Sequence, residues 1–188
     1  MSDLRDMNLL VPEFREKAEI LLTSLKNRGY DLRPCCTIRS PWEQARLWRS
    51  SRSREEISEF IENLKKNGAH VLVGYIESVG PQHGNKEVTK AAPGFSWHQF
   101  GEAMDCFVVR DGKARWSPDE EGYAVYASRA ESLGLTAGRY FTSFPDNPHV
   151  QLRSSGSPRD LYFDIEIEAR MVEIFGTDEK AWLAKVSV

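Results

Sequence analysis

The chain has 188 residues, of which 28% are charged and 40% hydrophobic, and its formal net charge is −3 at pH 7. This is the composition of an ordinary globular protein, and the weak negative charge gives no reason to expect a nucleic acid or an anionic membrane as a partner. No run approaches the roughly 18 apolar residues that cross a bilayer. The length suits one well-buried domain, so we expect a single domain over residues 1–188.

The first residues and the cysteines bear on where the protein is made. Residues 1–6 contain two acids and no apolar run like that of a signal peptide, so we expect synthesis in the cytoplasm. Cys35 and Cys36 are adjacent, a spacing at which a disulfide is strained. Reduced thiols are therefore expected, and the absence of a C-x-x-C pair argues against a cysteine zinc site.

The first part of the chain has three predicted helices and one extended segment. Apolar residues at three- and four-residue spacings predict a helix over residues 11–28. Residues 31–38 look extended, and a proline opens a helix over 41–48. Ser53 and Glu56 have the spacing of a capping box, which indicates the start of another helix.

The second part alternates helices with short strands. Residues 77–95 contain glycines and prolines without a period, so we expect a loop. The elements that follow are a strand over 103–109, a hairpin turn at 110–113, a helix over 118–133, short strands at 140–141 and 149–152, and tail helices over 158–175 and around Trp182. This order indicates an α+β fold with a central antiparallel sheet and flanking helices. We expect a core over 11–153 and a helical tail over 158–188.

Two short clusters contain two histidines and two aspartates. His98 and Asp105 stand in the first, and Asp146 and His149 in the second. Two imidazoles and two carboxylates suit a catalytic zinc site, which needs three protein ligands, an open position for water and a spare carboxylate. We predict one zinc ion per chain, held by His98, Asp105 and His149.

Strand alternation adds detail around Asp105. Along the predicted strand, Ala103 and Asp105 face one side, whereas Met104 and Cys106 face the other. The small side chain of Ala103 would leave space beside the metal, and Cys106 would point into the core.

Two further residues complete the predicted chemistry. Asp146 lies three positions before His149 and cannot easily share its metal if that segment is extended. It can instead take the proton of the attacking water as a general base. Arg39 is the candidate for stabilising the oxyanion, because its guanidinium donors are fixed and always charged.

The motif around His98 and Asp105 resembles that of a known family. Ser96-x-His98-x-x-Gly101-x-Ala103-x-Asp105 resembles, at every fixed position, the signature of the zinc peptidases of the DD-peptidase (M15) family. That family includes VanY-type D-Ala-D-Ala carboxypeptidases and phage L-alanyl-D-glutamate endolysins. The resemblance implies a Hedgehog/DD-peptidase-like fold and the peptidoglycan stem peptide as substrate.

Two other motifs extend the resemblance. Asp146-x-Pro148-His149 is similar to the family's second motif, in which the histidine is the third ligand and the acidic residue is the base. Arg39-Ser40-Pro41-x-x-Gln44 resembles an upstream element whose arginine contacts the substrate carbonyl. The resemblance implies that Gln44 and Ser96 contact the substrate or support the residues that do.

The sequence also departs from the family pattern. The family tends to show Phe-Glu after the second-motif histidine, whereas Val150-Gln151 stands here, and Pro145 takes the place of an aromatic residue. Neither departure affects a proposed zinc ligand, but these motifs do not identify which peptide bond is cleaved. Trp97 and Phe100 fit either the wall of a cleft or core packing.

Three functions fit these features. Without a signal peptide, a phage-type lysin released through membrane lesions is favoured, which points to cleavage of the L-Ala–D-Glu bond. The alternative is a D-Ala-D-Ala carboxypeptidase of the VanY type. A non-catalytic, zinc-containing Hedgehog-like binding module is the alternative from another class, and Asp146 argues against it because such a module needs no base. We expect a monomer acting on the cell wall.

Overall fold

The computed structural model describes residues 5–82, 84 and 88–186. Their contacts divide the chain into two units. Among the described residues, the sheet unit holds 5–38 and 101–154, and the helical unit holds 39–82, 84, 88–100 and 155–186. The single domain expected from the chain length stays a prediction.

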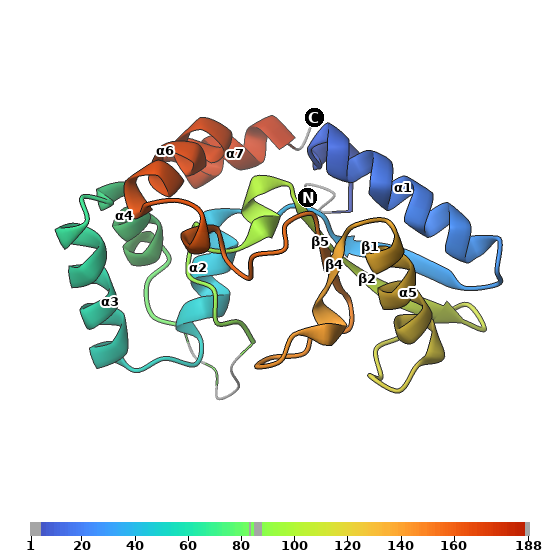
Figure 1. The fold of residues 1–188 in the computed structure, drawn as a ribbon. Coiled ribbons are helices and arrows are strands. Elements are labelled where there is room, and N and C mark those ends of the chain that lie inside the picture. Colours follow the sequence, from blue (N-terminus) through green and yellow to red (C-terminus); the bar gives the residue numbers. More distant parts are fainter. Residues whose placement is uncertain (1–4, 83, 85–87, 187–188) are drawn as a thin grey trace. The chain divides into compact units, whose positions relative to one another are not determined.

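The sheet unit contains an antiparallel sheet (Figure 1). Its strands are β1 (Asp31–Cys36), β2 (Ala103–Arg110), β3 (Lys113–Arg115), β4 (Thr136–Ala137) and β5 (His149–Gln151). The strand order is β1-β2-β5-β4, with β3 paired to β2, and every pairing is antiparallel. The predicted central antiparallel sheet is therefore confirmed.

One face of this sheet packs in the core of the unit. Helices α1 (Pro12–Lys26) and α5 (Glu121–Ser132) bury their apolar residues together with those of the strands. Met104 and Cys106 of β2 and Val150 of β5 are fully buried in this cluster. Side chains alternate along a strand, so Asp105 and His149 lie on the opposite face. The alternation predicted around Asp105 is confirmed.

The connections in the sheet unit follow from their backbone conformations. The β2–β3 turn places Asp111 at φ 54° and Gly112 at φ 70°, as a two-residue hairpin requires. The strand predicted at 140–141 is wrong, because Gly138–Tyr140 forms a short 3-10 helix, η3. The Gly138 carbonyl accepts the backbone N–H groups of Phe141 and Asp146 at 3.0 and 2.9 Å, which closes a turn where a strand was expected.

Over its described residues, the regular elements of the helical unit are all helices. They are α2 (Pro41–Arg49), α3 (Arg54–Lys66), α4 (His70–Ser78), α6 (Asp164–Phe175), α7 (Glu179–Val186) and the 3-10 helices η2 (Trp97–Phe100) and η4 (Pro158–Asp160). The capping box of Ser53 and Glu56 is present, and a second one links Ser40 and Glu43. Helix α4 was not predicted, because Ala69 makes no side-chain cap and the first N–H groups of the helix donate instead to Glu168, far along the chain.

A buried carboxylate ties the start of α6 to two other segments of the helical unit. Asp164 is 6% exposed and accepts hydrogen bonds from Arg159 at 2.7 and 2.8 Å. The Asn67 side-chain amide donates to the same carboxylate at 2.8 Å. The hydrogen bond from Arg159 is the main cause of the lowered pKa of Asp164, against the effect of burial.

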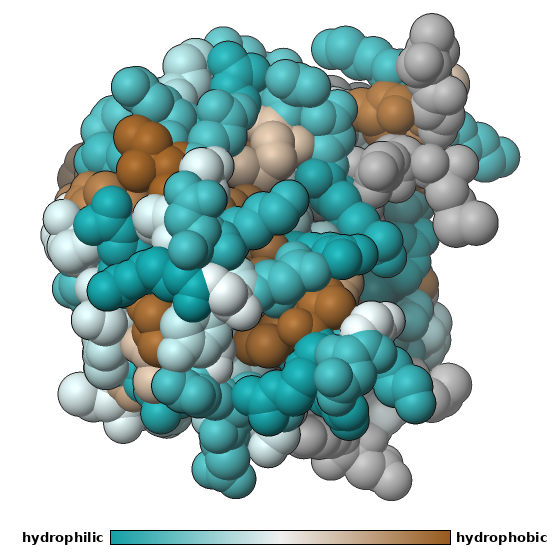
Figure 2. Space-filling model, turned by 90° about the vertical axis from the view of Figure 1, so that its right-hand side faces the viewer, coloured by the Kyte–Doolittle hydropathy of each residue, from teal (hydrophilic) through white to brown (hydrophobic). Residues whose placement is uncertain are grey.

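The surface combines polar cover with small apolar patches. The face drawn in Figure 2 is mainly hydrophilic, and its hydrophobic residues gather in separate patches, as on most globular proteins. Within the part of the chain that the structure describes, no helix combines the length and the apolar character needed to cross a bilayer.

Asp164→Asn should destabilise the protein at neutral pH by about 1–3 kcal/mol, since it removes a buried charge from two donors. Because the pKa of Asp164 is lowered by folding, its stabilising contribution is complete above about pH 4 and is lost as the pH falls through the folded value. Chemical denaturation across this pH range measures the effect. The control is Glu173→Gln, in an exposed pair with Arg170, which should change stability by less than about 0.5 kcal/mol. A loss that does not depend on pH would contradict the assignment.

Gly138→Ala should destabilise the sheet unit by about 1–3 kcal/mol through overpacking. An added Cβ would lie 2.6 Å from the Asp146 carbonyl oxygen and 2.9 Å from the His149 Cβ. Thermal unfolding measures the loss, and the imidazole NMR signals of His149 should shift. Gly156→Ala is the matched control, because a Cβ there meets nothing within 4 Å. Equal stability of the two variants would show that the close approach at Gly138 is not required.

Candidate metal centre

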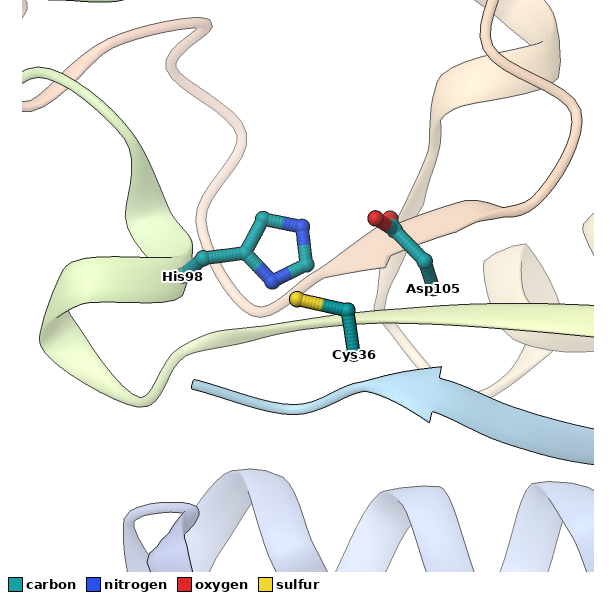
Figure 3. Close-up of side chains that lie close together, drawn as sticks. All are labelled: Cys36, His98 and Asp105. Carbon is teal, nitrogen blue, oxygen red and sulfur yellow. The ribbon is translucent and has the colours of Figure 1, made fainter. Parts of the chain in front are cut away.

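The site starts from the register of three neighbouring strands. Asp105 of β2 is paired with Cys36 of β1 and with His149 of β5. Residues directly opposite each other in an antiparallel sheet project from the same face. Figure 3 shows the side chains of Cys36 and Asp105 rising from the same side of their strands. One polar row therefore crosses the sheet on the face away from the core.

Asp105, Asp146 and His149 bring three possible ligand atoms together within the sheet unit. One carboxylate oxygen of each aspartate and one imidazole nitrogen lie within 4.8 Å of one another. Two ligands of a tetrahedral zinc ion lie about 3.4 Å apart, given bond lengths of about 2.0–2.2 Å. Small side-chain adjustments would close the cluster around a divalent cation, so this donor set fits one.

A turn, and not an extended segment, places Asp146 beside His149. The backbone N–H of His149 donates to the Asp146 carbonyl at 3.2 Å, and the Asp146 N–H donates to Gly138. An extended segment would make it difficult for Asp146 to share the metal bound by His149. The turn instead brings the Asp146 carboxylate within ligand reach, where it can serve as either a base or a ligand.

His149 is buried, with 8% of its surface exposed, and both of its ring nitrogens have partners. Nδ1 lies 2.9 Å from a carboxylate oxygen of Asp105, and Nε2 lies 3.0 Å from Oε1 of Gln151. The Phe141 ring packs against the imidazole at a centroid distance of 5.8 Å.

Opposing influences act on the pKa of His149. Burial, the largest, acts to lower it, but the hydrogen bond with Asp105 and the charges of Asp105 and Asp146 together raise it. The negative cluster thus favours a positive charge at its centre.

His98 is carried by the helical unit. It lies in η2 and is 2% exposed. Its neighbours fix this short helix, because the Trp97 indole donates to the Ser155 carbonyl at 2.8 Å and the Gln99 side chain accepts the Gly94 N–H at 2.8 Å. Its role as a ligand stays a prediction.

The other motif residues around η2 mainly form hydrogen bonds and packing contacts within the protein. Ser96 opens the helix, since its carbonyl accepts the Gln99 N–H at 3.0 Å. Trp97 and Phe100 are buried and pack edge to face at 5.4 Å, which favours core packing over a cleft wall.

Arg39 and Gln44 lie together in the helical unit. Arg39 directly precedes Ser40, the N-cap residue of α2, and its guanidinium donates to Oε1 of Gln44 at 3.2 Å. Gln44 is fully buried, and its amide donates to Ala91 O and Thr89 Oγ1 at 2.6 and 3.2 Å. Gln44 therefore holds Arg39 in place, and its burial argues against direct contact with a substrate.

The sequence alone did not identify two residues that lie beside the candidate ligands. The sequence predicts only a reduced thiol at Cys36, but its Sγ lies within 4.8 Å of a carboxylate oxygen of Asp105. Gln151 stood out only as a departure from the family pattern, yet it contacts His149 directly. The two-residue spacing of His149 and Gln151 signalled a shared face, whereas the pairing of Cys36 with Asp105 had no signal in the sequence.

The chain is similar to two solved structures. One is the L-Ala D-Glu endopeptidase ChiX of Serratia marcescens, with 14% identity, a TM-score of 0.48 and coverage of 81% of this chain and 86% of that one. The other is a point mutant of the vancomycin resistance D,D-pentapeptidase VanY from a VanB-type resistance cassette, in complex with Zn(II), with 17% identity, a TM-score of 0.45 and coverage of 93% and 83%.

No curated protein matches the chain. The profile of the VanY family, described as D-alanyl-D-alanine carboxypeptidase, matches residues 7–134, which is more than half of the chain. The protein therefore belongs to the VanY family of peptidoglycan peptidases.

Proposed function

We propose that the protein is a zinc-dependent peptidase that hydrolyses a peptide bond in the stem peptide of peptidoglycan. The supporting observation is the cluster of Asp105, Asp146 and His149 on the polar face of the sheet, in a chain of the VanY family. A hydrolase of this kind needs both ligands and a proton acceptor, and the cluster provides both.

In this proposal His98, Asp105 and His149 hold one zinc ion. When bound, zinc supplies Lewis acidity and lowers the pKa of water toward about 7. Asp105 provides a carboxylate on the rigid central strand, and His149 provides an imidazole on the neighbouring strand. His98 completes the set from η2.

Asp146 is the proposed general base. It takes a proton from the water that attacks the scissile carbonyl and then delivers it to the nitrogen of the leaving group, so that a carboxylate and an amine result. Its placement depends on the turn that joins it to His149 and on its contact with Gly138. A binding module without catalysis would have no use for this carboxylate as a base.

Arg39 is the proposed oxyanion stabiliser. Its guanidinium donates to the carbonyl oxygen as negative charge develops there. Gln44 keeps the guanidinium oriented through its own fixed amide. Ser96 lies at the start of η2. It is proposed either to contact the substrate or to help position the nearby His98.

Two bonds of the stem peptide are candidates. The sequence favours L-Ala–D-Glu cleavage, and that choice stays a prediction. The description of the matching family favours the D-Ala–D-Ala bond as the second candidate. Action on the cell wall follows from the substrate in either case, while the lysis route and the monomeric state stay predictions.

Asp146→Ala should retain zinc and lower kcat on purified peptidoglycan by about 10²–10⁴-fold, because the base is lost while the ligands stay. Metal analysis and a peptidoglycan release assay measure the two effects. Asp119→Ala, at an exposed aspartate of the same unit, is the matched control and should leave both unchanged. Undiminished hydrolysis in Asp146→Ala would remove the residue from the mechanism.

The ligand set has its own test. His98→Ala should lose both zinc and activity, in contrast to Asp146→Ala. A His98→Ala protein with a full complement of zinc would take this residue off the list of ligands.

Digestion of defined muropeptides, followed by mass spectrometry of the products, should distinguish the two bonds. L-Ala–D-Glu cleavage creates a new N-terminal D-Glu, whereas D-Ala–D-Ala cleavage releases free D-Ala. No product from either bond with the zinc-loaded protein would favour the binding module.

A further inference from the structure

We infer that Gln151 is a positioning residue that keeps the proton of His149 on Nε2 and thereby presents Nδ1 to the metal. The inference rests on the proposed zinc site and deepens it. Gln151 would touch neither metal nor substrate, and it would act only through His149.

The two side chains meet because of their spacing on β5. His149 and Gln151 are two residues apart on one strand and therefore share a face. Both are buried, with 8% and 2% of their surfaces exposed. Gln151 Oε1 lies 3.0 Å from His149 Nε2, so the imidazole and the amide are hydrogen-bonded where water has little access.

The orientation of the Gln151 amide is set from its other side. Its Nε2 donates to the Arg153 carbonyl at 2.7 Å. A carbonyl can only accept, so the opposite orientation would bring two oxygens together at that distance. Gln151 therefore presents an oxygen to His149, and His149 Nε2 must be the donor.

This fixes the tautomer of a metal-bound His149. A neutral imidazole has one N–H and one lone pair. With the proton on Nε2, the lone pair lies on Nδ1, the nitrogen next to Asp105. Partners that accept the N–H of the second ring nitrogen generally orient metal-bound histidines in this way.

Further hydrogen bonds hold the backbone carbonyl of Arg153 that orients the Gln151 amide. The Arg153 side chain forms a two-point ion pair with Glu102, at 2.6 and 2.8 Å, and Leu152 N donates to the Glu102 carbonyl at 2.8 Å. These bonds hold the Arg153 carbonyl that orients the amide. Directly opposite Gln151 on β2 stands Ala103, whose small side chain leaves room for the glutamine.

The first test is the metal-free protein. In wild type, NMR of the imidazole should show a hydrogen-bonded Nε2–H on His149. In Gln151→Met, which keeps the length of the side chain without an acceptor of similar strength, this proton should exchange faster with water. A His149 ring without a proton on Nε2 in wild type would overturn the inference, whatever the fate of the zinc site.

The second test is metal affinity. In the zinc-loaded wild type we expect Nε2–H to persist and Nδ1 to be the metal-bound nitrogen. Competition with a chelator should show a zinc dissociation constant raised about 10–100-fold in Gln151→Met. Gln151→Glu keeps an oxygen facing His149 but sets its other oxygen against the Arg153 carbonyl, so it should recover only part of the affinity.

Controls separate this inference from the proposed function. Gln82→Met, at a half-buried glutamine of the helical unit, should bind zinc as wild type does. A wild type that binds no zinc would refute the proposed metal site together with the effect of Gln151 on it. Wild-type zinc binding with equal affinity in Gln151→Met, or zinc on Nε2, would overturn the role of Gln151 alone.

Discussion

Asp105 and His149 face each other across two antiparallel strands, and most of the sheet unit depends on this pairing. Side chains alternate along each strand, so the same register that brings these two residues together sends Met104, Cys106 and Val150 into the core. A slip of one residue would bury the carboxylate and the imidazole and expose the apolar side chains. The register that buries the apolar core is therefore the same register that places Asp105 opposite His149, so core burial stabilises both.

Asp105, Asp146 and His149 concentrate two carboxylates around one imidazole. Two carboxylates lie within 4.8 Å of each other beside a buried imidazole, and like charges at such distances repel. The raised pKa of His149 reflects this, because a protonated imidazole offsets part of the negative charge. A divalent cation would do the same more completely. Strand pairing and the turn at Asp146 thus hold together a cluster whose donor atoms suit a divalent cation.

The predicted elements show where local patterns suffice. Helices with caps and amphipathic spacing, such as the one that starts at Ser53, form as expected because their signals lie within a few residues. The hairpin at Asp111 and Gly112 also follows from local backbone preferences. The strand expected at 140–141 was wrong because the Gly138 carbonyl is taken up by a turn to Asp146, eight residues away. The first N–H groups of helix α4 donate to Glu168, which lies far along the chain, so no local capping signal marks its start.

The sequence by itself determined the types of candidate ligand, their order along the chain and the face of β2 on which Asp105 stands. These follow from residue chemistry, motif spacing and the two-residue period of a strand. Only the tertiary structure decided that Cys36 pairs with Asp105, that a turn brings Asp146 within reach of His149, and that Gln151 is oriented by the Arg153 carbonyl. Those contacts depend on strand register and on the paths of turns, which are set by packing over the whole sheet unit and not by any short stretch of sequence.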